Sequence, residues 1–384
     1  MMKLLLLSLT ILLWNMRSVP QRPIRFTVQT IDSQLVATND MAIGDVDGDG
    51  LPDIVMARDR HVVWYRNGDW KTFVMAENDG TSYHKLAVRD INGDGLAEVA
   101  VSTTAAHGPM AHAGGYSTIQ YLSRPADPTL PWTTVTVDSG YAVQQLRWVN
   151  ADNDCHQLVV LPLSGHLLAY ENDDHPNRGW KRRVIHQPMP TAHQLEVYRY
   201  DEGDVCYVVG DSGIMGFQFK GGRWRQNTDD WLARGRELYQ ARMGTVAARS
   251  TYAFAAFEPG DLLTIYTQGI TDSLFRYNTI GRRIIEREMK GGGGLAMADF
   301  IGLDRQQVVA GWHTSNENND HGLKLFVPFN KYWEAIDVYW IDRRMACDGL
   351  KVADMNHDGK PDIVAFGNTT HNLKIYRNEN ESVY

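Results

Sequence analysis

Three short acidic segments have the side-chain spacing of a calcium-binding loop. In residues 45–53, oxygen-bearing side chains stand at positions one, three, five and nine, and a glycine follows the fifth. Residues 90–98 and 354–362 repeat this pattern. Hard oxygen donors in a flexible loop suit Ca²⁺ better than Mg²⁺ or Zn²⁺. The predicted ligands are Asp45, Asp47, Asp49 and Asp53; Asp90, Asn92, Asp94 and Glu98; and Asp354, Asn356, Asp358 and Asp362. Acidic turns that bind no metal remain the alternative, and in both cases the expected role is structural.

Each acidic loop joins a short strand of alternating pattern to a second, apolar strand, and this unit recurs along the chain. Further copies of the unit are weaker and lack the acidic residues of the loop. Taken together, the copies have first strands that begin near residues 41, 86, 146, 195, 243, 295 and 350. Intervals of 45 to 60 residues, with third and fourth strands between them, are typical of four-stranded propeller blades. The sequence therefore predicts an all-β fold, a seven-bladed β-propeller.

The ends of the chain predict how the ring closes. The last repeat stops without a fourth strand, whereas residues 25–31 precede the first blade and belong to none. We expect this N-terminal strand to pair with strands between residues 350 and 377, because closure removes exposed sheet edges. Residues 21–384 then form a single propeller domain.

The N-terminus and the composition narrow the location and the class of partner. Residues 1–3 are a short positive start and residues 4–14 are apolar, too short to span a bilayer. This indicates a signal peptide over residues 1–20 and a secreted or periplasmic protein, with a buried N-terminal strand as the alternative. No later stretch predicts a membrane span. The net charge of −8 and the lack of a basic run argue against nucleic acid as a partner.

With its repeats and acidic loops, the chain resembles the FG-GAP/VCBS-repeat propellers over nearly its whole length after the leader. This group includes integrin α-subunit heads, sugar-binding propellers and several bacterial polysaccharide-degrading enzymes. The resemblance implies a propeller with structural Ca²⁺, but a shared fold specifies function poorly.

The residues just before each first strand should ring one mouth of the central channel. Counting six residues back from each acidic position gives Asn39, His84, Gln144, His193, Arg242, Gly293 and Asp348. Two long loops on the same face add His107, His112, Tyr116, Trp312 and His313. Histidine transfers protons near neutral pH, arginine can hold a carboxylate with two hydrogen bonds, and an aromatic wall suits a sugar. We predict catalytic roles for His84, His107 and His193, and binding of an acidic oligo- or polysaccharide by His112, Tyr116, Gln144, Arg242, Trp312 and His313.

This combination resembles secreted seven-bladed propellers that act on rhamnose–glucuronate or ulvan-type polysaccharides, the α-L-rhamnosidases and polysaccharide lyases. In the lyases, a histidine pair and a tyrosine exchange protons beside a uronate, and arginine neutralises its carboxylate. His84 and His107 fit the pair, but Gln144 stands where the tyrosine is expected, and the following strand lacks the arginine. Three interpretations therefore stay open: a hydrolase, a lyase, and a non-catalytic, lectin-like propeller that binds a glycan or a protein.

Overall fold

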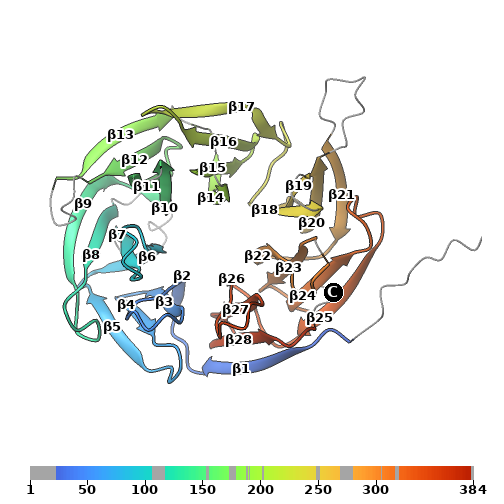
Figure 1. Ribbon diagram of the computed structural model, residues 1–384, viewed down its shortest axis with the longest axis horizontal. Helices are drawn as coiled ribbons and strands as arrows, with labels where there is room; N and C mark the ends of the chain where they lie inside the picture. The colour runs from blue at the N-terminus through green and yellow to red at the C-terminus, as the bar shows by residue number, and fades with distance from the viewer. Residues whose placement is uncertain are drawn as a thin grey trace, which may run out of the picture.

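The computed structural model confirms a seven-bladed β-propeller. It describes residues 23–105, 117–152, 155–172, 179–186, 189, 191–200, 203–247, 251–268, 280–303, 305–315 and 320–381. The regular secondary structure of these residues consists of β-strands alone. The strands form seven antiparallel, four-stranded sheets around a central axis (Figure 1). Among the same residues, no helix is long and apolar enough to cross a membrane.

The first six blades each use four consecutive strands, of which the first is innermost. Blades one to three are Thr38–Gly44 (β2), Asp53–Arg58 (β3), His61–Tyr65 (β4), Thr72–Glu77 (β5); Thr81–Arg89 (β6), Glu98–Ala105 (β7), Ser117–Ser123 (β8), Thr133–Tyr141 (β9); and Val143–Asp152 (β10), Cys155–Pro162 (β11), Leu167–Glu171 (β12), Lys181–His186 (β13). Blades four to six are Ala192–Tyr200 (β14), Gly203–Gly210 (β15), Gly213–Phe219 (β16), Trp224–Leu232 (β17); Gln240–Ala247 (β18), Thr251–Glu258 (β19), Leu262–Gln268 (β20), Ile280–Glu286 (β21); and Gly292–Ala298 (β22), Gln307–Trp312 (β23), Gly322–Pro328 (β24), Ile336–Asp342 (β25).

The seventh blade joins the two ends of the chain. Its strands are Gly349–Ala353 (β26), Asp362–Gly367 (β27), Asn372–Asn378 (β28) and the N-terminal Phe26–Asp32 (β1). Strand β1 is antiparallel to β28, with Phe26 opposite Asn378, and forms the outer edge of the blade (Figure 1). The pairing leaves no blade without its fourth strand.

The core lies between the blades. Strand β23 is buried along its whole length, which explains why second strands read as continuous apolar runs instead of alternating. One inter-blade cluster packs Trp64 and Val55 of blade one against Leu86 and Val99 of blade two. Each blade thus buries both faces against its neighbours, and the ring holds the inner strands rigidly around the channel.

Candidate functional site at the channel mouth

A β-bulge lies near the start of the inner strand in most blades, at one rim of the channel. In five blades, the ladder between the inner and second strands skips one inner-strand residue. A bulged residue is unpaired, and the local kink re-aims its side chain. The five bulged residues are Asn39, His84, Gln144, His193 and Gly293, which all belong to the ring predicted from the sequence.

His193 forms the clearest chemical constellation on this rim. Its Nε2 lies 2.7 Å from Oδ1 of Asp211, which stands in the two-residue turn between β15 and β16. Burial by itself raises the pKa of Asp211, but hydrogen bonds from His193 and Thr191 hold that pKa below its ordinary value. An ionised Asp211 fixes the proton of neutral His193 on Nε2, so Nδ1 is left as the proton acceptor.

Tyr239 completes this group. Its ring meets the His193 ring edge-on, with centroids 5.6 Å apart, and its side chain is 47% exposed. A hydrogen bond to Glu237, together with some burial, raises the pKa of the Tyr239 hydroxyl. The hydroxyl therefore keeps its proton at neutral pH. The constellation contains one group that can accept a proton and one that can donate a proton.

The sequence reasoning missed both partners of His193. Asp211 comes 18 residues after it, in a turn that faces the same rim. Tyr239 precedes the next inner strand, whose start the sequence placed near residue 243. A search of every loop on this face for carboxylates and tyrosines would have found them.

The other predicted rim residues have different surroundings. His84 is half-buried on β6, directly before Lys85. The Nε2 of Gln144 donates to the backbone carbonyl of His193 at 3.1 Å, so this amide ties blade three to blade four. Thr314 Oγ1 lies 3.2 Å from Nδ1 of His313, whose backbone N–H bonds to Gly291 on the same rim. His107, His112 and Tyr116 lie outside the described residues.

Two predicted binding residues are not placed as the sequence suggested. Arg242 is opposite Ala255 in β19 with no bulge beside it, which puts it deeper in the channel than the bulged rim, and its Nη1 contacts Glu196 at 2.8 Å. Trp312 is only 2% exposed, with its ring packed on Trp340. Arg242 is therefore already paired with a carboxylate, and Trp312 fills the core of blade six instead of forming an open wall for a sugar.

The three acidic loops lie at the opposite ends of the inner strands and share one hydrogen-bond pattern. In residues 45–53, 90–98 and 354–362, the first aspartate accepts the N–H of the glycine five positions on, at 2.9, 2.9 and 2.8 Å. The fifth residue accepts the N–H two positions ahead, at 2.8, 2.8 and 2.9 Å. The fourth residue takes a left-handed φ in all three loops: 81° for Gly48, 77° for Gly93 and 57° for His357. The backbone of the loop is therefore a repeated structure.

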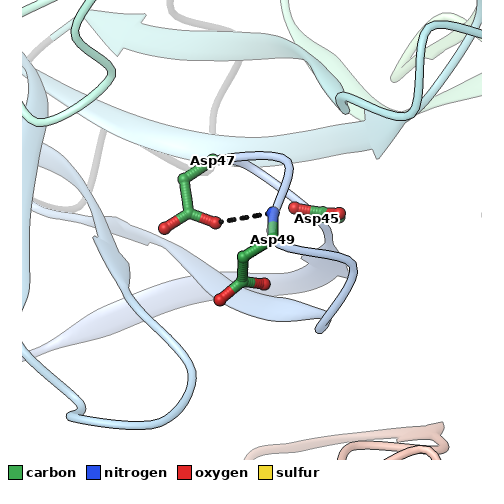
Figure 2. Close-up of side chains that lie close together, drawn as sticks. All are labelled: Asp45, Asp47 and Asp49. Atoms are coloured by element: carbon green, nitrogen blue, oxygen red, sulfur yellow. Dashed lines mark hydrogen bonds between the residues drawn. The ribbon is translucent and has the colours of Figure 1, made fainter.

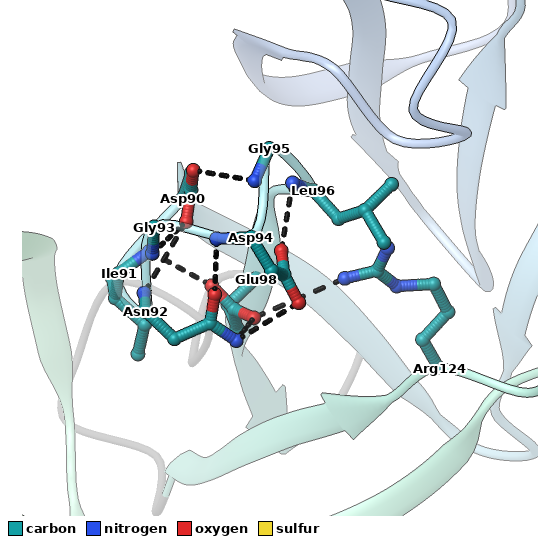
Figure 3. Close-up of polar contacts among 9 residues, drawn as sticks. All are labelled: Asp90, Ile91, Asn92, Gly93, Asp94, Gly95, Leu96, Glu98 and Arg124. Atoms are coloured by element: carbon teal, nitrogen blue, oxygen red, sulfur yellow. Dashed lines mark hydrogen bonds and ion pairs between the residues drawn. The ribbon is translucent and has the colours of Figure 1, made fainter.

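These loops present oxygen atoms of the kind that a hard cation binds. One oxygen each from Asp45, Asp47 and Asp49 lie within 4.8 Å of one another (Figure 2). In the second loop, Asn92 replaces the middle carboxylate, and its Nδ2 donates to Asp94 at 3.1 Å (Figure 3). This donor set fits Ca²⁺.

The ninth position of each loop is buried and anchors the loop to its blade. The two oxygens of Asp53 accept the N–H groups of Val46 and Asn67, at 2.8 and 2.7 Å. Asp362 does the same for Met355 and Asn378, at 3.0 and 2.7 Å. Burial, with added repulsion from neighbouring carboxylates, raises the pKa of Asp53 to about 7. Each oxygen retains a second lone pair, so this anchoring is compatible with a role as cation ligand.

Comparisons with known proteins agree with this architecture. A family model described as an FG-GAP-like repeat matches residues 45–101, which hold the first two acidic loops. No curated protein matches the chain.

Three similar solved structures belong to proteins of different kinds. BBS1N in complex with ARL6DN has a TM-score of 0.58 and 13% identity, over 93% of this chain and 98% of that one. The exotype rhamnogalacturonan lyase YesX has a TM-score of 0.52 and 13% identity, over 94% and 74%. The WD40 domain of SCAP from fission yeast has a TM-score of 0.51 and 10% identity, over 94% and 99%. At such low identity these similarities establish the fold alone.

Proposed function

We propose that this protein is a secreted, carbohydrate-active propeller that cleaves an acidic polysaccharide at the rim where the inner strands begin. The observation that carries the proposal is the His193–Asp211 pair, 2.7 Å apart, on a bulged inner strand. A bulge on a rigid strand is a favourable support for a catalytic side chain, because the scaffold fixes its direction.

The same residues account for proton transfer at a glycosidic bond. Nδ1 of His193 accepts a proton, Asp211 orients the ring, and the Tyr239 hydroxyl donates a proton to the leaving oxygen. At a uronate, these two proton transfers amount to an elimination. The C–H bond next to the carboxylate and the C–O bond of the glycoside break, and a carbon–carbon double bond forms. In a hydrolase, His193 would instead take its proton from the attacking water. Lys85, which follows His84 on β6 and interacts with Asp40, adds a positive charge near this rim and favours an acidic sugar there.

Calcium belongs to the same proposal as a structural ion. The acidic loops 45–53, 90–98 and 354–362 would hold it through their side-chain oxygens at positions one, three, five and nine. When bound, the ion neutralises carboxylates that otherwise repel one another. The loops themselves order the junction of the first and second strands.

A panel of acidic polysaccharides tests the function. Elimination would create an unsaturated uronate that absorbs in the near ultraviolet, whereas hydrolysis would release new reducing ends, including rhamnose, without that absorbance. Either product from the purified protein supports the proposal. Saturable binding of a glycan without product would overturn cleavage and leave a lectin-like propeller.

A non-catalytic binding propeller is the second candidate. Two positions favour it: Arg242 is paired with Glu196, and Trp312 is buried in blade six. Neither side chain is therefore placed to contact a sugar at the rim. A similar propeller, BBS1N, was solved in complex with a protein, ARL6DN. Absence of turnover on every polysaccharide of the panel would favour this candidate.

A further inference from the structure

The central channel contains a cavity whose charged lining is entirely basic. The cavity measures about 250 Å³ and is bounded by five inner strands, β2, β6, β10, β14 and β26 (Figure 1). Its four charged lining residues are Arg89, Arg147, Arg199 and Lys351, and the rest of the lining is apolar. The chain as a whole carries a net charge of −8, so the overall charge does not explain a cluster of cations at this place.

The carboxylates near the cavity do not balance these cations. Arg89 is paired with Asp204, and Asp40 and Glu196 lie close enough to act on Lys351. The same two carboxylates also face further cations, since Asp40 interacts with Lys85 and Glu196 with Arg242. Six cations therefore share three carboxylates along this stretch of the channel.

Two of the lining cations have donors to spare. Arg147 donates through Nη1 to the backbone carbonyls of Leu86 and Leu146, at 3.3 and 2.8 Å, and forms no ion pair with a described carboxylate. Lys351 likewise forms no ion pair within the described part of the chain. A guanidinium has five N–H donors, so most of those of Arg147 remain for a ligand.

We propose that this cavity is a binding site for one compact oxyanion, a sulfate, a phosphate or a carboxylate, held by Arg147 and Lys351. Charged hydrogen bonds in a low-dielectric channel are strong, and the guanidinium fork matches the shape of an oxyanion. Pockets for larger ligands measure about 300–1,000 Å³, so this volume suits a single ion or one charged substituent of a sugar. The site is independent of cleavage at the rim.

Calorimetric titration at pH 7 in chloride buffer of constant ionic strength tests the proposal. The titrants are inorganic sulfate, inorganic phosphate, glucuronate and, as the neutral control, glucose. We expect saturable one-to-one binding of an oxyanion and none of glucose. Binding of the inorganic ions would identify a free anion as the occupant, and binding of glucuronate alone would identify a sugar carboxylate.

Matched variants locate the site. Lys351→Met should weaken binding about 10- to 100-fold, the value of one charged hydrogen bond. Lys351→Arg keeps the charge and should stay close to wild type. Lys71→Met removes an exposed lysine of blade one and should change nothing. If Lys351→Met fails to fold, Arg147→Gln replaces it. Wild-type affinity in either folded cavity variant, or no saturable binding of any oxyanion to the wild type, would overturn the proposal.

Discussion

The two ends of the inner strands differ in what the blades share. Both ends repeat a backbone structure from blade to blade, but only one end also repeats the side chains. At one end, three acidic loops repeat both their backbone hydrogen bonds and their oxygen-bearing side chains. At the other end, five blades repeat a bulge, but the bulged side chain changes from asparagine to histidine, glutamine and glycine. Uniform side chains on a uniform backbone indicate a shared structural task. Varied side chains on a uniform backbone are what we expect of the one asymmetric ligand-binding site that we propose.

The largest effect that this comparison predicts is the loss of turnover at the bulged rim. His193→Ala should reduce turnover of the cleaved polysaccharide by about 10²- to 10⁴-fold, because it removes the proton-transferring group. The melting temperature should stay near that of the wild type, since the side chain is part-exposed. His61→Ala is the matched control, because it removes another part-exposed histidine that is paired with a carboxylate, Glu77. Equal turnover in both variants would remove His193 from the reaction.

Chelation should act on the other rim and affect stability. If Ca²⁺ binds only the folded chain at about 100 times its Kd, its removal costs about 2.7 kcal/mol. EDTA should then lower the melting temperature by several degrees, and Asp45→Ala should reduce that response. Asp127→Ala serves as control, because Asp127 is an acid in an exposed turn outside the three loops. Identical melting with and without EDTA, with no metal found by elemental analysis, would contradict the calcium proposal.

A smaller effect on stability is expected from the channel between the rims. Burial, with repulsion from Arg147, lowers the pKa of Lys351 from 10.5 to about 8, so the folded chain holds this proton less firmly than the unfolded chain. Wild-type stability should therefore rise between about pH 8 and 10.5. Lys351→Met should be more stable than wild type by about 1–3 kcal/mol at pH 7 without oxyanions. Urea denaturation across this pH range measures the difference, which should vanish by the upper end. A less stable variant at pH 7 would contradict this account.

The smallest effect concerns the oxyanion itself. Lys351 on β26 faces Asp40 on β2, Glu196 on β14, Arg147 on β10 and Arg242 on β18. As the pH rises past about 8, Lys351 loses its charge, and sulfate affinity should fall about tenfold by pH 10. Sulfate keeps its own charge throughout, so titration with this ion isolates the protein's contribution. Constant affinity over the range would exclude Lys351 as a ligand.

The fold was more predictable than the site, for physical reasons. Burial of each blade against two neighbours forces apolar strands at a regular spacing, which the sequence displays directly. Arg242 was assigned to the ring although it lies deeper in the channel, because blade five has no acidic loop to count from and its ladder is irregular only near the far end of β18, between Thr245 and Ala247. The burial of Trp312 depends on packing against Trp340, a contact between strands that spacing does not reveal. Asp211 meets His193 because the two-residue turn between β15 and β16 lies beside the start of β14, a contact between strands that the sequence does not display.

A crystal structure of the His193→Ala variant with an acidic oligosaccharide tests most directly whether the bulged rim is the functional face. The account predicts the sugar beside Asp211 and Tyr239, over the mouth of the channel. An oligosaccharide bound instead at the rim of the acidic loops, near residues 45–53 or 354–362, would contradict it and reverse the roles assigned to the two ends of the inner strands.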